Sequence, residues 1–585
     1  MNERLTEFWE KGANAGVKLL AFVLPLAFYL KTYNTDLVKE ATLLAGVCVI
    51  WFCTVARHIE AGRVEWPANR TLIAVLAKAL CGWLLVVWAL SAQPELYAFP
   101  LMRFLLFVTL FLLVATGPAS VSFAAGLSAA ASAAAGLAGL YAVLQAAGLD
   151  PLLWQGAYGR QAFATMARPE LLGVFSAAAF PLALSLTVNP TAQRAKRLAA
   201  HAAAAAAFTG VILSGSGTAL AVFAVAAALF SLFALARLGG EGRAAGWLAA
   251  AAVPAAALGT IAYGGGFAAL LSLRLRPSLL PASGTGPALL CAVLLLAVFA
   301  SSLKDYLRRS REGELRAAAI IAGQWAGAFA ILLAGLLGAA ANSAAIGALL
   351  WLLAGSLTGL ALERGAAQVY VIPIPAPPGL RRLLYLPAGA LAALGCLAAL
   401  TLMGWDCNHN TALHLAGRGE TAAAVARFDG VSLWHPNGLH ARYLAANLTA
   451  GAGDWENALR RYDQLERRAR HYRRLDFRKA AALAALHRGA EAERSLLAYV
   501  KFRTDDPEAY RLLVDVSTDL GKNEQSHRAA LQLVRLEPDE PRHWHLLAEQ
   551  YKRRGDYANA RRMLDRASKV RDYAGGKTSP GKPIY

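Results

Sequence analysis

Long apolar runs fill the first 404 residues, and no other feature of the chain limits its possible folds as strongly. A helix needs about 20 residues to cross a bilayer, so runs close to this length predict membrane-spanning helices. Thirteen candidate spans occupy residues 15–30, 41–56, 71–91, 100–116, 120–148, 170–188, 198–214, 218–236, 244–270, 286–303, 317–337, 341–362 and 383–404. The sequence therefore predicts an all-α fold that begins with a polytopic bundle of about 13 transmembrane helices.

The distribution of charge divides the chain into two regions. Only 16% of the residues are charged, against about 25% in soluble domains, which excludes a soluble enzyme. Of the 58 Lys and Arg residues, 31 follow residue 404, so a membrane part (1–404) precedes a water-exposed part. The formal net charge of +20 does not favour a nucleic-acid partner, because much of it lies in short loops between apolar runs.

Basic residues alternate between the loops, and this pattern predicts the orientation of the chain. The basic loops contain Arg57, Arg63, Arg70, Arg194, Lys196, Arg197, Arg237, Arg243, Lys304, Arg308, Arg309, Arg311, Arg316, Arg364, Arg381 and Arg382. The loops between them contain only Lys31, Lys39, Arg160, Arg168, Arg274 and Arg276. The N-terminus is therefore predicted to be cytoplasmic. An odd number of spans then places the C-terminal part outside, which for a bacterial inner-membrane protein is the periplasm.

The water-exposed part has the residue spacing of tetratricopeptide repeats. The clearest unit contains Trp544, Leu547, Ala548, Tyr551, Gly555, Ala560, Leu564 and Ala567. Two of its positions recur 34 residues earlier, at Tyr510 and Gly521. Further turns at Gly417 and Gly419, at Gly453 and at Gly489 predict about five units over residues 405–572, followed by a disordered tail over residues 573–585.

Such helix pairs stack into an α-solenoid whose concave surface suits a peptide or protein partner. The alternative is that some pairs only form a helical cap on the membrane domain. In the repeat interpretation, Trp544 is expected to be buried between the two helices of the last unit.

Two segments of the membrane part carry a resemblance to a known family. GRQAFATMARPELLGVFSAAAFPLALSL covers residues 159–186, and GVILSGSGTALAVF covers residues 210–223. Together with TYNTDLVKEATLLAGV near the start and exterior repeats after the last span, they make the chain resemble the superfamily of O-antigen ligases, O-antigen polymerases and bacterial protein O-oligosaccharyltransferases. The resemblance implies a metal-independent glycosyltransferase without a cofactor. It would move a glycan from a polyprenyl diphosphate carrier to lipid A core, another glycan or a protein hydroxyl.

The first segment matches the family pattern only in part. Arg160, Phe163 and Pro169 match it, whereas Arg168 and Glu170 stand where the family usually has asparagines.

The rest of the expected site departs further from the family. Ser216 is followed by Gly217 where an arginine is usual, and the large exterior loop that normally carries an arginine and a histidine is reduced to SLRLRPSLLPASGTG. The histidines of the membrane part, His58 and His201, are both predicted to be cytoplasmic.

Four arginines are candidates for binding the diphosphate. A leaving diphosphate develops negative charge, and guanidinium groups bind phosphate oxygens in pairs. Beyond the first exterior loop, the only basic residues predicted to be exterior are Arg160, Arg168, Arg274 and Arg276. The resemblance implies that they form a diphosphate clamp with Arg160 as a catalytic residue. The alternative is that Arg160 and Arg168 contact lipid headgroups.

Candidate acids are few. Glu170 lies two residues after Arg168 at the start of a span, so it is expected either to deprotonate an acceptor hydroxyl or to pair with that arginine. Asp150 precedes Pro151 and is expected to form a turn. The run Asp406-Cys407-Asn408-His409 does not predict a metal site, because four consecutive residues cannot all point inward.

The sequence leaves two functions open. The first is an O-antigen ligase-like transferase of cell-envelope assembly, whose partners are membrane lipids and the polyprenyl-diphosphate-linked glycan. The second is a catalytically inactive relative that serves as a membrane-anchored scaffold and holds a protein partner, such as an envelope or surface-filament component, through its repeats. Loss of the histidine favours the scaffold, and retention of Arg160 favours the enzyme.

Overall fold

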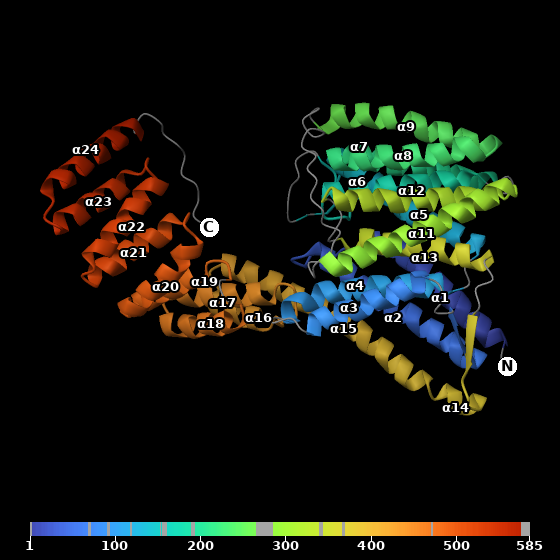
Figure 1. Cartoon of the computed structure of the whole chain (residues 1–585), viewed down its shortest axis with the longest axis horizontal. Helices are drawn as coiled ribbons and strands as arrows, with labels where there is room; N and C mark the ends of the chain where they lie inside the picture. Colours follow the sequence, from blue (N-terminus) through green and yellow to red (C-terminus); the bar gives the residue numbers. More distant parts are fainter. Residues whose placement is uncertain are drawn as a thin grey trace. The chain divides into compact units, whose positions relative to one another are not determined.

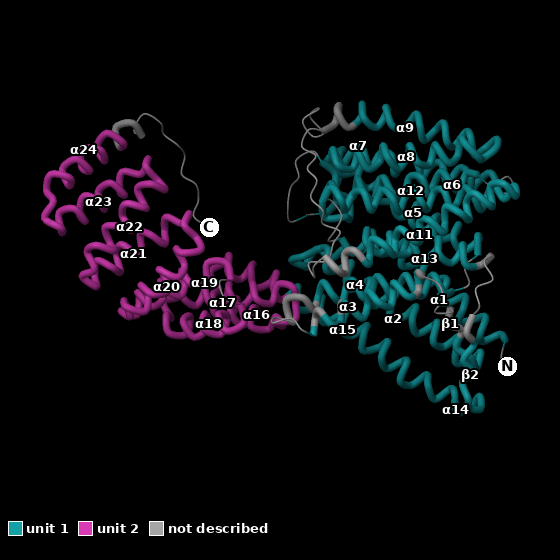
Figure 2. Tube along the Cα trace, viewed as in Figure 1, with its two compact units in different colours: residues 1–407 teal, residues 408–585 magenta. Residues whose placement is uncertain are grey.

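The protein folds into two compact units, which comprise residues 1–407 and 408–585 (Figure 2). The computed structural model describes residues 3–67, 72–89, 94–117, 120–152, 154, 161–188, 193–264, 285–338, 343–364, 369–469 and 472–574. The sequence prediction placed the division between residues 404 and 405.

The first unit, unit 1, is a bundle of helices (Figure 1). Its helices are α1 (Glu3–Leu26), α2 (Thr35–Ala61), α3 (Leu72–Ala89), α4 (Pro94–Ala115), α5 (Val121–Ala146), α6 (Pro169–Thr187), α7 (Arg194–Leu213), α8 (Gly217–Arg237), α9 (Gly240–Gly264), α11 (Thr285–Arg311), α12 (Leu315–Leu336), α13 (Ala344–Arg364), α14 (Pro378–Arg382) and α15 (Tyr385–Gly417). Every predicted span overlaps one of them.

Among the described residues, eight helical segments are long and apolar enough to cross a membrane, and a shorter apolar helix covers Phe99–Ala115. The number thirteen stays a prediction. The first two predicted spans began too late, because α1 starts at Glu3 and α2 at Thr35. Lys39, predicted to lie in a loop, is therefore part of α2.

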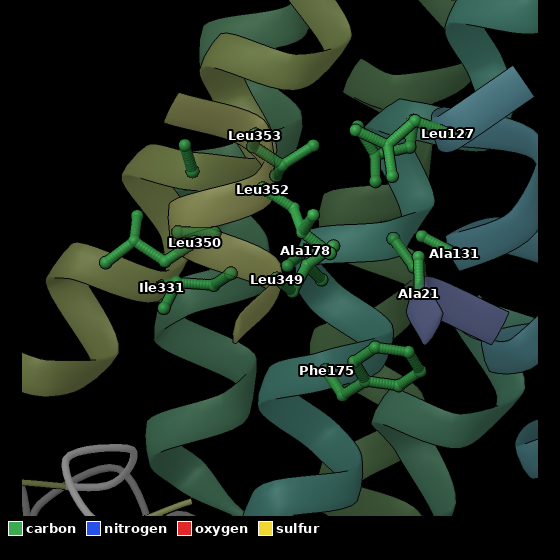
Figure 3. Packing of buried hydrophobic residues seen from close by; sticks show 14 of the residues in the cluster. Ala21, Leu127, Ala131, Phe175, Ala178, Ile331, Leu349, Leu350, Leu352 and Leu353 are labelled. Atoms are coloured by element: carbon green, nitrogen blue, oxygen red, sulfur yellow. The ribbon is translucent and has the colours of Figure 1, made fainter. Parts of the chain in front are cut away.

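Helix α6 forms the centre of unit 1 and packs against α5, α7, α8 and α12. Figure 3 shows its Phe175 and Ala178 among buried aliphatic side chains of neighbouring helices. The close approach of α6 and α12 depends on glycine. A Cβ added at Gly327 of α12 would lie 2.7 Å from the carbonyl oxygen of Ala178. The Ala- and Gly-rich composition of these spans therefore serves close helix packing.

A small sheet and two charge clusters join distant parts of unit 1. Strands β1 (Arg63–Pro67) and β2 (Val369–Pro373) pair antiparallel. Beside them, Arg382 Nε donates a hydrogen bond to Glu60 (3.1 Å).

The second charge cluster surrounds Arg309, which was predicted to lie in a loop. It is instead part of α11, only 2% exposed. Its guanidinium group contacts Asp305 (2.8 Å), Glu314 (3.2 Å) and the carbonyl oxygen of Leu360 (3.2 Å).

The second unit, unit 2, is a row of helical hairpins. It contains the end of α15 and then α16 (Thr421–Asp429), α17 (Gly438–Gly451), α18 (Trp455–Arg468), α19 (Leu475–Ala485), α20 (Gly489–Phe502), α21 (Pro507–Asp519), α22 (Asn523–Leu536), α23 (Pro541–Arg553) and α24 (Tyr557–Ala574). The turn inside each hairpin has one residue with positive φ, and these residues are 34 positions apart: Gly419, Gly453, His487, Gly521 and Gly555. The third turn was predicted at Gly489, and the structure places it at His487 instead.

Two rows of small buried residues follow the same period. The first helices of the hairpins contribute Ala412, Ala446, Ala480, Val514 and Ala548. The second helices contribute Ala424, Ala458, Ala492, Ser526 and Ala560. All ten are at most 1% exposed, so each marks a place where two helices touch. Five hairpins with a 34-residue period have the architecture of tetratricopeptide repeats.

Two details of unit 2 differ from expectation. Trp544 is only half-buried: its Nε1 donates to the carbonyl oxygen of Pro538 (2.7 Å), and the guanidinium group of Arg566 lies 5.3 Å from the ring centroid. Trp544 is therefore less buried than predicted, because its indole lies at the edge of the last hairpin. Helix α24 ends at Ala574, so Tyr573 and Ala574 are helical, and the rest of the predicted tail lies outside the described residues.

Candidate functional site

The two segments that carry the family resemblance meet in unit 1. The N–H of Ala162 donates to the carbonyl oxygen of Leu213 (3.0 Å), and Gln161 Nε2 donates to that of Gly215 (3.3 Å). Ser216 then caps α8, because its hydroxyl accepts a hydrogen bond from the N–H of Ala219 (3.3 Å). The first segment thus lies against the turn between α7 and α8.

The loop of residues 161–168 has an unusual backbone. Ala164 (φ 46°) and Ala167 (φ 67°) both adopt left-handed conformations. These cost an alanine about 1–2 kcal/mol each. Gln145 of α5 holds the loop in place, since its Oε1 accepts hydrogen bonds from the N–H groups of Phe163 (3.1 Å) and Ala164 (2.7 Å). Strain of this kind persists only where the surroundings fix the backbone.

Lys39 joins this loop to two helices. Its ammonium group, fully buried in the bundle, donates to the carbonyl oxygens of Pro25 (3.0 Å), Ala27 (2.7 Å) and Thr165 (2.8 Å). The Thr165 hydroxyl donates to Pro25 as well (2.9 Å). All three ammonium protons are thus used, and Lys39 acts as a positioning residue for the loop.

Asp36 lies one helical turn before Lys39 and is surrounded by cations. Lys39, Arg168 and Arg103 are all close enough for their charges to act on its carboxylate. Asp36 Oδ1 is buried and has no hydrogen-bond partner among the described residues. Arg103 itself pairs with the buried Glu40 (2.9 Å).

Arg168 is the exposed cation of this group. It precedes Pro169 at the start of α6, and within the described part of the chain no ion pair of Arg168 is present. A guanidinium group in this position can bind an anionic group, such as a phosphate or carboxylate. Sequence analysis missed this cluster, although the spacing of Asp36, Lys39 and Glu40 on one helical face was a signal for it.

The other predicted site residues are placed as follows. Arg160, Arg274 and Arg276 lie outside the described residues, so a convergence of the four arginines stays a prediction. Glu170 is half-buried in the first turn of α6. No ion pair joins it to Arg168 where both are described, so the expected pairing is not observed. A carboxylate in the first turn is favoured by the helix dipole in any case.

Asp150 forms a turn, as expected. Its carboxylate accepts hydrogen bonds from the Tyr141 hydroxyl (2.6 Å), Gln145 Nε2 (2.9 Å), Trp154 Nε1 (3.0 Å) and the N–H of Leu152 (3.0 Å). Burial alone would raise the pKa of Asp150, but these hydrogen bonds outweigh it and lower the pKa below its ordinary value. A carboxylate held in this way does not abstract a proton from a substrate.

The run at residues 406–409 is not arranged around a metal. Asp406 Oδ2 accepts a hydrogen bond from the N–H of Asn34 (2.9 Å). In the part of the chain that the structure describes, no group of three or more His, Cys, Asp or Glu side chains has a metal-binding arrangement.

Comparison with known proteins found matches among solved structures. No protein-family model matches the chain, and no curated protein matches it. Similar solved structures include a double mutant of MamA RS-1, at 20% identity and a TM-score of 0.28, covering 30% of this chain and 97% of that one. MamA from Desulfovibrio magneticus RS-1 is 20% identical with a TM-score of 0.27, covering 29% and 96%. YrrB, described as a TPR protein with an unusual peptide-binding site, is 18% identical with a TM-score of 0.26, covering 28% and 86%. The assignment of repeats in unit 2 depends on the 34-residue spacing and not on these likenesses.

Unit 2 contains a groove between its third and fourth hairpins. It has a volume of about 670 Å³ and lies between α20 and α22, with α21 as its floor. The apolar lining comes from Leu497, Val500, Tyr510, Leu513 and Ala529. The polar lining comes from Lys522, which precedes α22, and from Asn523, Glu524, Gln525 and Arg528 of α22. Sequence analysis predicted a partner surface on the concave side of the repeats, without naming its residues.

Proposed function

We propose that this protein is a membrane-anchored scaffold that holds a protein partner through unit 2 in assembly of the cell envelope. The observation that carries the proposal is the row of five hairpins with an open groove of peptide size. Repeat arrays of this kind use their extended surfaces to bind peptides and proteins. The apolar helices of unit 1 support a role as the anchor.

The proposed anchor crosses the bacterial inner membrane thirteen times, with the N-terminus in the cytoplasm and unit 2 in the periplasm. The loop charges support this orientation. A reporter that is active only in the periplasm should be active after Tyr585 and silent at Arg309. The opposite result would reverse the orientation and move unit 2 to the cytoplasm.

The scaffold is tested in cells with the full chain. A photo-crosslinking amino acid at Leu497, which lines the groove, should give one predominant protein adduct. The same amino acid at Tyr557, which is 72% exposed on α24, is the matched control and should not give that adduct. Removing the partner's gene should reproduce the envelope defect of cells that lack this protein. Absence of any adduct from exposed positions scanned over α16–α24 would contradict the scaffold.

Glycan transfer is the second candidate, and the cluster around Asp36 favours it. Arg168 is exposed beside a buried carboxylate and a strained loop, within the segment that resembles the transferase family. In this alternative, Arg160 and Arg168, with Arg274 and Arg276, bind the diphosphate of the carrier. Glu170 then takes the proton from the acceptor hydroxyl.

Arginine substitutions separate the two candidates. If Arg160 binds two phosphate oxygens, Arg160→Lys should reduce transfer nearly as much as Arg160→Ala, since an ammonium group lacks the planar fork. The assay is transfer of a lipid-linked glycan in cells that lack the native protein, with insertion of each variant checked. No transfer by the unaltered protein, together with a phenotype that requires only unit 2, would eliminate the transferase.

A further inference from the structure

We infer that the groove between α20 and α22 binds an acidic peptide segment that carries an apolar side chain. This inference rests on the proposed scaffold function and names the chemistry of the partner. Its evidence is the lining of the groove, an unused hydrogen-bond donor within it and the charges along its walls.

The apolar lining supplies the first part of the argument. Leu497 of α20 is 42% exposed, which is high for a leucine that faces a groove floored by the well-buried Tyr510 and Leu513. An apolar side chain seated here would cover Leu497 and the neighbouring Val500. Buried apolar anchors of this kind usually supply most of the affinity at peptide-binding surfaces.

An unused donor lies in the same groove. The Nε2 atom of Gln525 is buried and has no hydrogen-bond partner among the described residues. Leaving such a group unpaired is unfavourable, so a rotation of the Gln525 side chain that brings Nε2 to an acceptor on a bound chain would improve it. The backbone carbonyl of a peptide is the acceptor that any sequence can offer.

Basic residues flank the groove on both helices. On α20, Arg494 and Lys501 share the helical face of Leu497, at spacings of three and four residues. On α22, Arg528 and Arg535 share a face with Gln525.

The nearby acids are already neutralised. Glu493 pairs with Lys522, and Glu524 pairs with both Arg528 (3.3 Å) and Arg554 (3.1 Å). These pairs also occupy Lys522 and Arg528, so the excess positive charge near the groove comes from Arg494 and Lys501 on α20 and from Arg535 on α22. It favours a partner with Asp and Glu residues beside its apolar anchor.

A second copy of the chain fits less well. Residues 408–585 contain 31 Lys and Arg but 22 Asp and Glu, so two such units repel each other overall. Single-stranded nucleic acid would be expected to use aromatic side chains as stacking platforms. The groove instead has a leucine and a valine at its mouth.

The test uses the full chain in nanodiscs of neutral lipid and a fluorescent octapeptide, Glu-Asp-Glu-Leu-Leu-Glu-Asp-Glu. We expect saturable binding below about 1 mM by fluorescence anisotropy. Leu497→Asp should weaken binding by about tenfold or more, because it places a carboxylate in the apolar lining. Arg528→Glu should weaken it as well, and its effect should shrink as salt is added. Tyr557→Asp and Arg562→Glu on α24 are the matched controls and should leave the affinity unchanged.

Three results of direct binding would overturn the inference. They are absence of binding up to the same concentration, equal binding of a peptide with lysines in place of its acids, and equal binding of a peptide with serines in place of its leucines. Competition by an oligonucleotide as strong as that of the unlabelled peptide would also overturn it. If the octapeptide does not bind but the protein adduct at Leu497 is still formed in cells, the acidic chemistry of the partner is rejected and the scaffold is not. Loss of every crosslink would reject the scaffold itself.

Discussion

Units 1 and 2 differ in where their charged side chains lie. In unit 1 the charged groups of Lys39 and Arg309 are buried, and each is surrounded by several carbonyl or carboxylate oxygens. In unit 2 many charged side chains pair on exposed helix faces, as do Lys569 and Asp565 four residues apart (2.9 Å), although Glu493 is buried. A buried charge has no water to replace a lost partner, whereas an exposed one does. Each buried charge in unit 1 therefore depends on its complete set of partners.

Removing one lysine from each unit tests this difference and should give the largest effect. Lys39→Met removes the ammonium donor from three carbonyl oxygens, of which that of Pro25 keeps the Thr165 hydroxyl as a donor. It should destabilise unit 1 by roughly 3–5 kcal/mol, as for a broken buried charge interaction. Lys569→Met should change the stability of unit 2 by no more than about 0.5 kcal/mol. Hydrogen exchange of the full chain in nanodiscs measures both. Similar protection losses in the two variants would contradict the comparison.

Acid should destabilise unit 2 through its buried histidines. Burial, with the charge of His409 as a second cause, lowers the pKa of His435 to about 4. Burial also lowers the pKa of His440. Between about pH 4 and 6.5 the unfolded chain binds protons that the folded chain does not, so stability rises with pH in this window and is lost on acidification. For His435 the loss near pH 4 is roughly 3 kcal/mol.

Urea unfolding of the full chain, followed by probes in unit 2 at several pH values, measures this slope. His435→Gln should remove much of it. A stability of unit 2 that is flat from pH 7 to pH 4 would show that these imidazoles are protonated in the folded state as well.

The small-residue rows predict an intermediate effect. Ala492 of α20 is fully buried where two helices touch, so Ala492→Leu should overpack the contact and cost about 1–3 kcal/mol. Ala498 of the same helix is exposed, and Ala498→Leu should be nearly neutral. Thermal unfolding followed by local hydrogen exchange distinguishes the two. Equal effects would mean that the 34-residue register is displaced.

The smallest expected effect is a stabilisation. His487 has φ 57°, a backbone conformation that suits glycine, so His487→Gly should stabilise the third hairpin by up to about 1 kcal/mol. Gly521→Ala at the equivalent turn (φ 70°) should destabilise the fourth hairpin by about as much. Protection from hydrogen exchange in α20 and α22 measures the stability change in the two variants. A destabilised His487→Gly variant would indicate that the imidazole makes a contact stronger than the backbone strain.

Some of this structure was predictable from the sequence, and the reasons differ between the units. The repeat period was visible because Tyr510 and Trp544, and Gly521 and Gly555, occupy equivalent positions. The third hairpin was misplaced because His487 holds the turn where a glycine was expected. In unit 1 the apolar runs located the helices, but not their ends.

The spacing of Asp36, Lys39 and Glu40 indicated one charged helical face, but the partners of Lys39 were not predictable, because the cluster forms only when the end of α1, the start of α2 and the loop of residues 161–168 come together. A local sequence pattern does not indicate contacts between such distant segments. The same holds for Arg309, whose partners come from three segments of the chain.

The shared period of the turns and of both small-residue rows has a consequence for the length of the array. Every hairpin offers its successor the same kind of contact, so a segment of 34 residues can be duplicated or deleted between equivalent positions without a new packing solution. Grooves would then be added or lost one at a time. Homologous chains with four or six hairpins are therefore physically as acceptable as this one with five.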